Sequence, residues 1–205
     1  DYARIEASLL SALENEEFEL HYQPQVRLAD GKITGVEALI RWNHPEQGQL
    51  LPKKFIGIAD DLNLIDSISE WVLRTAIRDH KQWFKKGLMA PRIAINITDH
   101  QISNEQSVKK LLKLLDEFAP AKNIIQFDLE ITESALVRIE DRIDIINILR
   151  ERGVMFAIDD FGTGHSSLIR LKQFPIDSLK INQSFVSDIA DEGDGKTMAA
   201  AIIAI

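Results

Sequence analysis

Hydrophobic and polar residues alternate along several short segments of this chain, as they do in β-strands with one buried face. In the segment 18–25, Phe18, Leu20 and Tyr22 stand two residues apart, with polar residues between them. The pair Asp30-Gly31 then predicts a turn that joins this strand to the next. By the same pattern we expect six strands, at 18–25, 33–42, 92–97, 124–131, 154–159 and 179–181.

Apolar residues at helical spacing separate most of these strands. Ser67 and Glu70 are spaced as a capping box for a helix that Gly87 ends. Ser103 is the candidate cap of the next helix. Further helices are expected at about 136–150, at 166–172 and from Gly195 onward.

Alternating strands and helices favour an α/β fold with a parallel sheet, either doubly wound or closed into a (β/α) barrel. The predicted strands have one apolar and one polar face, whereas a doubly wound sheet needs apolar residues on both faces. We therefore expect a TIM-like barrel, with a lead-in helix at 1–17 and the barrel domain at 18–205. Such a barrel has eight strands. The chain ends within the apolar stretch 199–205, so we expect its C-terminal strands to be missing.

Composition narrows the classes of function. The 205 residues include no cysteine, which excludes disulfides and thiolate metal sites and fits the reducing cytoplasm. Asp and Glu number 32 against 24 Lys and Arg, so the chain lacks the positive field that a nucleic-acid polymer requires. No apolar run approaches the roughly 20 residues of a membrane span. We expect no membrane contact from this segment, although the parent protein could be membrane-anchored.

Polar side chains on four predicted strands suggest a metal site. Glu37, Asn96, Glu130 and Asp159 each lie on the polar face of a different strand. Hard oxygen ligands that converge from strand ends suit Mg²⁺ or Mn²⁺. The adjacent Asp160 could reach a second ion, and paired metals are common in phosphodiester cleavage.

Two cations lie on the polar faces as well. Arg41, four residues after Glu37, is placed to bind a phosphate oxygen, and Lys180 lies on the last strand. Each residue alone has an ordinary explanation: strand-end carboxylates are mostly caps or turn residues, Arg41 could form an ion pair, and Lys180 could be solvated. None of the five histidines has metal-ligand spacing, and none is assigned a role. The recurrence of polar residues on one face of successive strands is what favours a site.

Six motifs in order resemble the EAL domain family. Glu37-Ala38-Leu39, followed by Ile40-Arg41-Trp42 and His44-Pro45, is similar to the signature that names the family. The match covers essentially the whole chain. The other motifs are Tyr22-Gln23-Pro24, Asn96-Ile97-Thr98, Glu130-Ile131-Thr132-Glu133, Asp159-Asp160-Phe161-Gly162-Thr163-Gly164 and Leu179-Lys180-Ile181-Asn182.

The resemblance implies a (β/α) barrel that hydrolyses cyclic di-GMP to linear pGpG with Mg²⁺ or Mn²⁺, as two ions. Lys180 would orient the attacking water, and Glu133 would anchor the loop at 161–167. The implied site residues are Glu37, Asn96, Glu130, Asp159, Asp160 and Asn182 for metal, Gln23, Leu39 and Arg41 for substrate, and Lys180 and Glu133 for catalysis.

The sequence departs from the family at two positions within the chain. Asn182 stands where the family usually has aspartate; its amide can still offer an oxygen to a metal, but without charge, so we expect the second ion to bind more weakly. His165 stands where tyrosine is common. The family's downstream Glu-Gly-Val-Glu motif, which supplies a catalytic glutamate, would lie beyond Ile205.

The resemblance also implies partners and an alternative function. EAL domains are commonly joined to an upstream sensor or diguanylate cyclase domain, and we expect a homodimer. The alternative to a phosphodiesterase is a catalytically weak or inactive EAL domain that acts as a cyclic di-GMP receptor. Because the metal motifs up to Asp160 are intact, the sequence favours the enzyme.

Overall fold

The computed structural model describes residues 2–88, 92–117, 126–162, 171, 174–187 and 195–204. Its internal contacts divide the chain into two compact units. The first unit comprises residues 1–96 and 109–127, and the second comprises residues 97–108 and 128–205. The helix expected at 166–172 lies, apart from Leu171, outside the described residues, as does His165.

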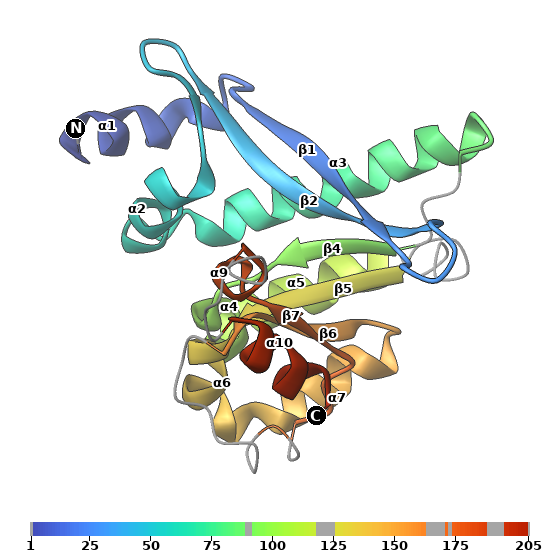
Figure 1. Cartoon of the computed structure of the whole chain (residues 1–205). Coiled ribbons are helices and arrows are strands. Elements are labelled where there is room, and N and C mark those ends of the chain that lie inside the picture. The colour runs from blue at the N-terminus through green and yellow to red at the C-terminus, as the bar shows by residue number, and fades with distance from the viewer. Residues whose placement is uncertain are drawn as a thin grey trace. The chain divides into compact units, whose positions relative to one another are not determined.

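The first unit is built on a long β-hairpin, with α3 running behind it (Figure 1). Its first two strands pair antiparallel, the short third strand pairs antiparallel with the second, and the fourth runs parallel to the second. The strands are β1 (Phe18–Val26), β2 (Ile33–His44), β3 (Gly48–Leu50) and β4 (Arg92–Asn96). The helices are α1 (Tyr2–Ala12), α2 (Ile56–Asp61), α3 (Ile65–Lys85) and, from Lys109 onward, α5 (Glu105–Glu117). The three strands predicted in this unit are confirmed, and β3 is an addition.

One face of the hairpin forms an aromatic core. The ring centroid of Phe18 lies 5.9 Å from that of Trp42, 5.7 Å from that of Phe55 and 5.8 Å from that of Trp71. Trp42 is fully buried, and its indole Nε1–H donates to Glu17 Oε2 at 2.8 Å. Large buried rings contribute strongly to core stability, and the buried indole keeps a hydrogen-bond partner. Because strand side chains alternate, the polar residues predicted between these apolar ones face away from this core.

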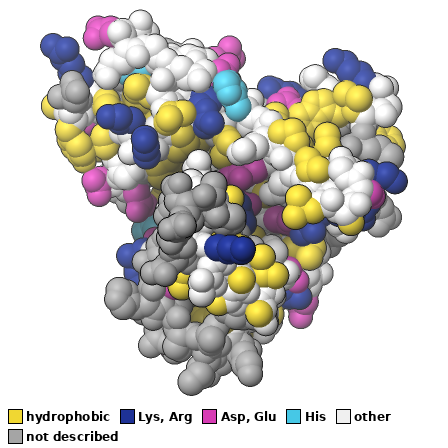
Figure 2. Space-filling model, in the orientation of Figure 1, with side chains coloured by type: hydrophobic (Ala, Val, Ile, Leu, Met, Phe, Trp, Pro, Cys, Tyr) yellow, Lys and Arg dark blue, Asp and Glu magenta, His cyan; other side chains and the backbone are white. Residues whose placement is uncertain are grey.

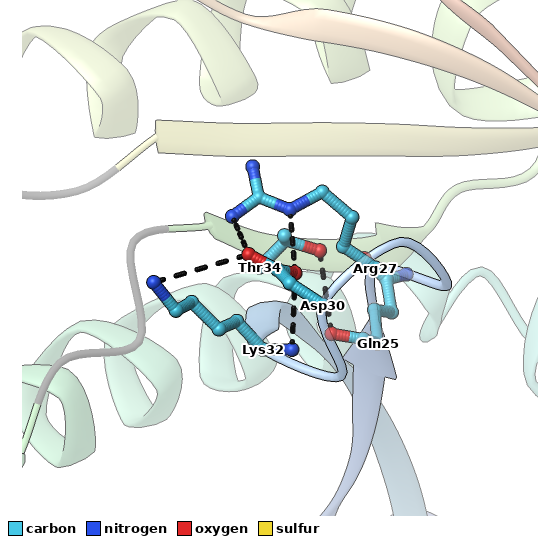
Figure 3. Close-up of polar contacts among 5 residues, drawn as sticks. All are labelled: Gln25, Arg27, Asp30, Lys32 and Thr34. Carbon is cyan, nitrogen blue, oxygen red and sulfur yellow. Dashed lines mark hydrogen bonds and ion pairs between the residues drawn. The ribbon is translucent and has the colours of Figure 1, made fainter.

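The turn of the hairpin is held by a bidentate ion pair (Figure 3). Arg27 donates from Nε and Nη2 to the two carboxylate oxygens of Asp30, each at 2.8 Å. Gly31 has φ +69°, a conformation that glycine adopts without strain, and its N–H donates to the carbonyl of Arg27 at 2.9 Å. The hydrogen bonds from Arg27 lower the pKa of Asp30 from its ordinary value of 3.8. The turn predicted at Asp30-Gly31 is confirmed.

The second unit contains three parallel strands and the helices that cover them (Figure 1). Phe156, Ile158, Ile131 and Ile146 are almost fully buried and form its apolar core. The strands are β5 (Gln126–Thr132), which belongs to this unit from Asp128, β6 (Met155–Phe161) and β7 (Ser178–Ile181). The helices are α4 (Asp99–Ser103), α6 (Glu133–Arg138), α7 (Ile143–Glu151), α9 (Gln183–Ser187) and α10 (Gly195–Ile203), with a 3₁₀ turn at Glu140–Arg142.

Two predicted helix caps were wrong. Ser67 lies inside α3, which begins at Ile65 with no side-chain cap, because Ile65 and Ile68 are both buried in the core. Glu70 instead accepts a hydrogen bond from Arg74 Nε at 2.8 Å. Ser103 closes α4 and is not a cap of the next helix. The capping box forms at the start of α4, from Thr98 and Gln101.

The single helix predicted at 136–150 is interrupted. It consists of α6, a 3₁₀ turn and α7, with Ile139 fully buried at the break. The Arg142 guanidinium, just after the break, donates to the backbone carbonyl of Ser103 at 2.9 Å. This long-range contact fixes the bend, and the periodicity of a single segment contains no sign of it.

On the face in Figure 2, Lys and Arg side chains are scattered among acidic and apolar ones. No helix within the described ranges combines the length and apolarity that a membrane crossing requires.

Candidate active site

In the first unit, the candidate metal ligands Glu37 and Asn96 touch. Glu37 lies on β2 and Asn96 at the end of β4, which runs parallel to β2. The side-chain amide Nδ2 of Asn96 donates to Glu37 Oε1 at 3.0 Å. A carboxylate oxygen can only accept here, so the amide group of Asn96 faces Glu37 and its carbonyl oxygen faces elsewhere. The pair therefore joins the Glu37 carboxylate to the NH₂ group of Asn96, and the Asn96 oxygen is directed away from that carboxylate.

The candidate substrate residues lie beside Glu37 on the same face of the hairpin. Gln23 is exposed on β1, whereas Leu39 and Arg41 are half-buried on β2. Arg41 Nη1 donates to the carbonyl of Ile40 at 2.9 Å, which restrains its guanidinium. An amide, an apolar side chain and a cation suit a purine base joined to a phosphate. The antiparallel register pairs Gln23 with Glu37, His21 with Leu39, and Glu19 with Arg41.

Strand β1 is anchored through a contact that the sequence did not reveal. The Tyr22 hydroxyl donates to Asp79 Oδ2 on α3 at 2.8 Å, and its ring meets Trp83 edge-on with centroids 4.6 Å apart. Burial is the main cause that raises the pKa of Tyr22, and the bond to Asp79 raises it further. Tyr22 therefore holds the adjacent Gln23 on the open face. Both partners are more than fifty residues away in sequence, so no local pattern reports the contact.

His21 and Glu19 are further polar residues of this face, and no role was predicted for either of them. His21 Nε2 lies 2.9 Å from Glu19 Oε1, and Gln49 Nε2 donates to the same oxygen at 2.8 Å. The hydrogen bond from His21 is the main cause that lowers the pKa of Glu19. Strand alternation alone places both residues on the same face as Gln23, so this pattern could have identified them as candidate site residues.

In the second unit, a lysine ammonium joins two candidate metal ligands. Lys180 Nζ on β7 lies 2.7 Å from Glu130 Oε2 and 3.3 Å from Asp159 Oδ1. The side chain of Glu130 is only 1% exposed, whereas those of Asp159 and Lys180 are 25% and 29% exposed. A carboxylate this deeply buried is stable only beside a positive charge and hydrogen-bond donors. Three neighbouring parallel strands therefore gather two acids and one cation.

The end of β6 carries the remaining candidates. Asp160 has φ +54°, a left-handed conformation that is uncommon outside glycine. Gly162 has φ +98°, and its N–H donates to the buried carboxylate of Glu133 at 2.9 Å. A Cβ at Gly162 would lie only 2.7 Å from the ring of Phe185. Asn182, after β7, donates from its amide to Asp160 Oδ1 at 2.7 Å.

The predicted residues thus form two sets, one in each unit. Across the described part of the chain, no group of three or more His, Asp or Glu side chains is arranged to hold a metal ion. An amide supplements the acid in the first set, and an ammonium lies between the acids in the second. The first set is Gln23, Glu37, Leu39, Arg41 and Asn96, and the second is Glu130, Glu133, Asp159, Asp160, Lys180 and Asn182.

The model of the family described as "EAL domain" matches residues 6–205. The chain belongs to the EAL domain family. Its fold is accordingly the mixed α/β, TIM-like barrel fold of EAL domains.

Named relatives of this EAL domain are signalling proteins of Pseudomonas aeruginosa. It is 40% identical to the cyclic di-GMP phosphodiesterase NbdA over 203 residues, which are 98% of this chain and 26% of NbdA. It is 38% identical over 199 residues to the bifunctional diguanylate cyclase/cyclic di-GMP phosphodiesterase MucR, covering 96% of this chain and 29% of MucR. The chain therefore spans less than a third of the length of these relatives.

A solved structure is also similar. The PaMucR phosphodiesterase in its c-di-GMP complex superimposes with a TM-score of 0.88 at 37% identity, covering 98% of this chain and 81% of that one. The similarity extends over nearly the whole chain, so it supports the EAL fold independently of the short sequence motifs.

Proposed function

We propose that this EAL domain hydrolyses cyclic di-GMP to linear pGpG and depends on a divalent cation, Mg²⁺ or Mn²⁺. The observation that carries the proposal is the cluster of Lys180 with Glu130 and Asp159, in a chain whose relative NbdA is named a cyclic di-GMP phosphodiesterase. Two acids and an ammonium at the ends of neighbouring parallel strands can bind water and a phosphoryl oxygen together.

Substrate binding is assigned to the open face of the hairpin in the first unit. Arg41 offers a planar cation to a phosphate oxygen, and Gln23 offers an amide that can pair with the edge of a guanine base. Leu39 lies between them along the strand faces and supplies apolar contact to the ring. The complex of PaMucR with c-di-GMP supports this ligand class.

The donor chemistry of both sets fits a divalent cation. Carboxylate and amide oxygens are the ligands that Mg²⁺ and Mn²⁺ prefer, and the ion pairs of Glu130 and Asp159 with the Lys180 ammonium support placing positive charge beside these acids. We assign Glu37, Asn96, Glu130 and Asp159 to a first ion and Asp160 to a second; the order of the family motifs supports joining these residues. Such ions, when bound, activate water and offset phosphoryl charge.

The chain's own residues divide the remaining work. Lys180 orients the attacking water and stabilises the charge that grows on the phosphoryl oxygens. Water adds to phosphorus and one ring P–O bond breaks. The departing oxygen takes the proton that the attacking water loses and becomes a hydroxyl, which opens the cyclic dinucleotide. Glu133 is a positioning residue, because its carboxylate holds the Gly162 N–H and thereby the chain that follows Asp160.

Receptor function is the second candidate, and Asn182 is the observation that favours it. An uncharged amide stands beside Asp160, where the family usually has a second acid. A protein with this site could bind cyclic di-GMP and pass the signal to an attached domain without turnover. MucR, which joins both activities in one protein, supports the proposal of an upstream domain. A homodimer remains part of the proposal from the family resemblance.

The test is to incubate the intact parent protein with cyclic di-GMP and follow pGpG by chromatography, with Mg²⁺, with Mn²⁺ and with EDTA. We expect pGpG with either metal and none in EDTA. Tight binding without product in the same samples would replace the enzyme by the receptor. Neither binding nor product would overturn both candidates.

A further inference from the structure

Asn182 connects the end of β6 to the start of α9. Its side-chain oxygen Oδ1 accepts hydrogen bonds from the Ser184 backbone N–H at 2.8 Å and from Ser184 Oγ at 2.7 Å. Its amide nitrogen Nδ2 lies 2.7 Å from Asp160 Oδ1. A backbone N–H can only donate, so the atom that faces Ser184 must be the oxygen. The orientation of the amide is thereby fixed, and its NH₂ group faces Asp160.

This orientation changes what Asn182 can do. Asn182 Oδ1, the atom predicted from the sequence as a possible metal ligand, already accepts two hydrogen bonds at the start of α9. The group that faces the candidate site is a donor, and donors do not coordinate cations. Asn182 therefore acts on the site through Asp160.

An aspartate in the same conformation would behave differently. One of its oxygens would still accept the Ser184 N–H, and the other would lie where the amide nitrogen now lies, 2.7 Å from Asp160 Oδ1. Two ionised oxygens at hydrogen-bond distance repel each other strongly, and a shared proton or a bound cation relieves the repulsion. The amide replaces this repulsion with a charge-assisted hydrogen bond.

The hydrogen bond from Asn182 reaches a residue whose backbone conformation is unfavourable. Asp160 adopts a left-handed conformation that is sparsely populated for non-glycine residues and must be held by its surroundings. Two residues further on, α9 and α10 lie close to Gly162, where an added Cβ would stand 2.7 Å from the Phe185 ring and 3.2 Å from Ile202. Asn182 thus contributes a side-chain hydrogen bond at Asp160 itself.

We propose that Asn182 is a positioning residue whose amide hydrogen bond holds the Asp160 carboxylate in place without a cation. The proposal rests on the proposed function only in giving Asp160 a role at the site. In this chain the Asn182 amide supplies a hydrogen bond at Asp160, whereas an aspartate at position 182 would bring a second acid whose repulsion a cation relieves.

Asn104 provides a matched control. It precedes α5, and its Oδ1 accepts the Gln106 and Ser107 N–H groups at 2.9 and 3.1 Å. Like Asn182, it therefore accepts the N–H of the second residue after it, but Asp160 is not its partner. Asparagine and aspartate are comparable caps. A change from Asn to Asp at position 104 therefore measures the capping effect alone.

The experiment compares native protein, Asn182→Asp and Asn104→Asp, each in the intact parent protein, by thermal melting in EDTA and in a Mn²⁺ titration. We expect Asn182→Asp to melt roughly 2–4 °C below native in EDTA, as a loss near 1 kcal/mol produces in a domain of this size. We expect Mn²⁺ to restore that difference and calorimetry to detect additional Mn²⁺ binding. Asn104→Asp should match native throughout.

Equal melting of Asn182→Asp and Asn104→Asp in EDTA, or an equal response of both to Mn²⁺, would overturn the proposal. Asn182→Ala adds a second check: it should melt below native by a similar amount with and without Mn²⁺, because it brings no second acid. Rescue of Asn182→Ala by Mn²⁺ would also count against the proposal. The melting in EDTA needs no substrate, so a failure to hydrolyse cyclic di-GMP would leave this test standing.

Discussion

The two units hold their candidate site residues by different means. In the first unit, Gln23, Glu37, Leu39 and Arg41 are placed by the register of one antiparallel hairpin. In the second unit, neighbouring parallel strands bring Glu130, Asp159 and Lys180 together, and ion pairs join their side chains. Regular backbone fixes the first set whether or not its polar groups find partners. The second set depends on its own charges, so a single substitution there should disturb both the site and the unit.

The largest effect on turnover is expected for Glu37→Ala in the first unit. The change removes the carboxylate that Asn96 contacts and that we assign to the first cation. Formation of pGpG should fall to the background rate, whereas the melting temperature should stay near that of the native protein because Glu37 is not part of the core. Glu70→Ala, which removes an exposed carboxylate on α3, is the control. Unaltered turnover would remove Glu37 from the site.

The largest effect on stability is expected for Lys180→Met in the second unit. It leaves the buried Glu130 without its ammonium, and breaking such a pair typically destabilises by about 3 kcal/mol. Urea unfolding measures the change. Lys110→Met is the control, because Lys110 pairs with Asp66 at 3.1 Å but its side chain is 60% exposed. The double variant Lys180→Met/Glu130→Gln should recover part of the loss. If Lys180→Met and Lys110→Met had equal free energies of unfolding, the claim that the second set depends on its own charges would be wrong.

A smaller effect is expected for Gly162→Ala. The new Cβ would meet the Phe185 ring at 2.7 Å and would also be strained at φ +98°, which together should destabilise by about 1–3 kcal/mol. Gly153→Ala has a similar φ of +83° but nothing within 4 Å, so it isolates the backbone strain. Thermal melting of both variants gives the difference. Equal melting temperatures would mean that α9 does not pack firmly on Gly162.

The smallest effect is expected at the hairpin turn. Arg27→Ala removes an exposed ion pair, and such pairs contribute little to stability. The folded state lowers the pKa of Asp30, so the pair stabilises the fold at pH values above the ordinary 3.8. That contribution is lost as the pH falls through the lower, folded-state pKa. Melting curves of native protein and Arg27→Ala should therefore converge only when the pH has fallen below the folded-state pKa of Asp30, which itself lies below 3.8; a difference that persists with Asp30 fully protonated would contradict the assignment.

The alternation of side chains predicted more of this molecule than any other feature of the sequence. It placed Gln23, Glu37 and Arg41 on one open face, and the register of β1 and β2 confirms this. The geometry of the second set was harder to predict from the sequence, because it depends on contacts between distant residues. Nothing local to Asn182 shows that its amide would face Asp160, since this orientation is set by Ser184. Likewise, the break between α6 and α7 depends on Arg142 reaching Ser103.

The most direct test of the central claim is the rate of pGpG formation by native protein and by Lys180→Met, at saturating cyclic di-GMP and Mn²⁺, with each rate corrected for the folded fraction. Removal of a positioned donor from developing charge typically lowers turnover by about 10²–10³-fold. We predict a loss of this size for Lys180→Met. A corrected rate equal to that of the native protein would contradict the account, because the cluster of Lys180, Glu130 and Asp159 would then have no part in the reaction.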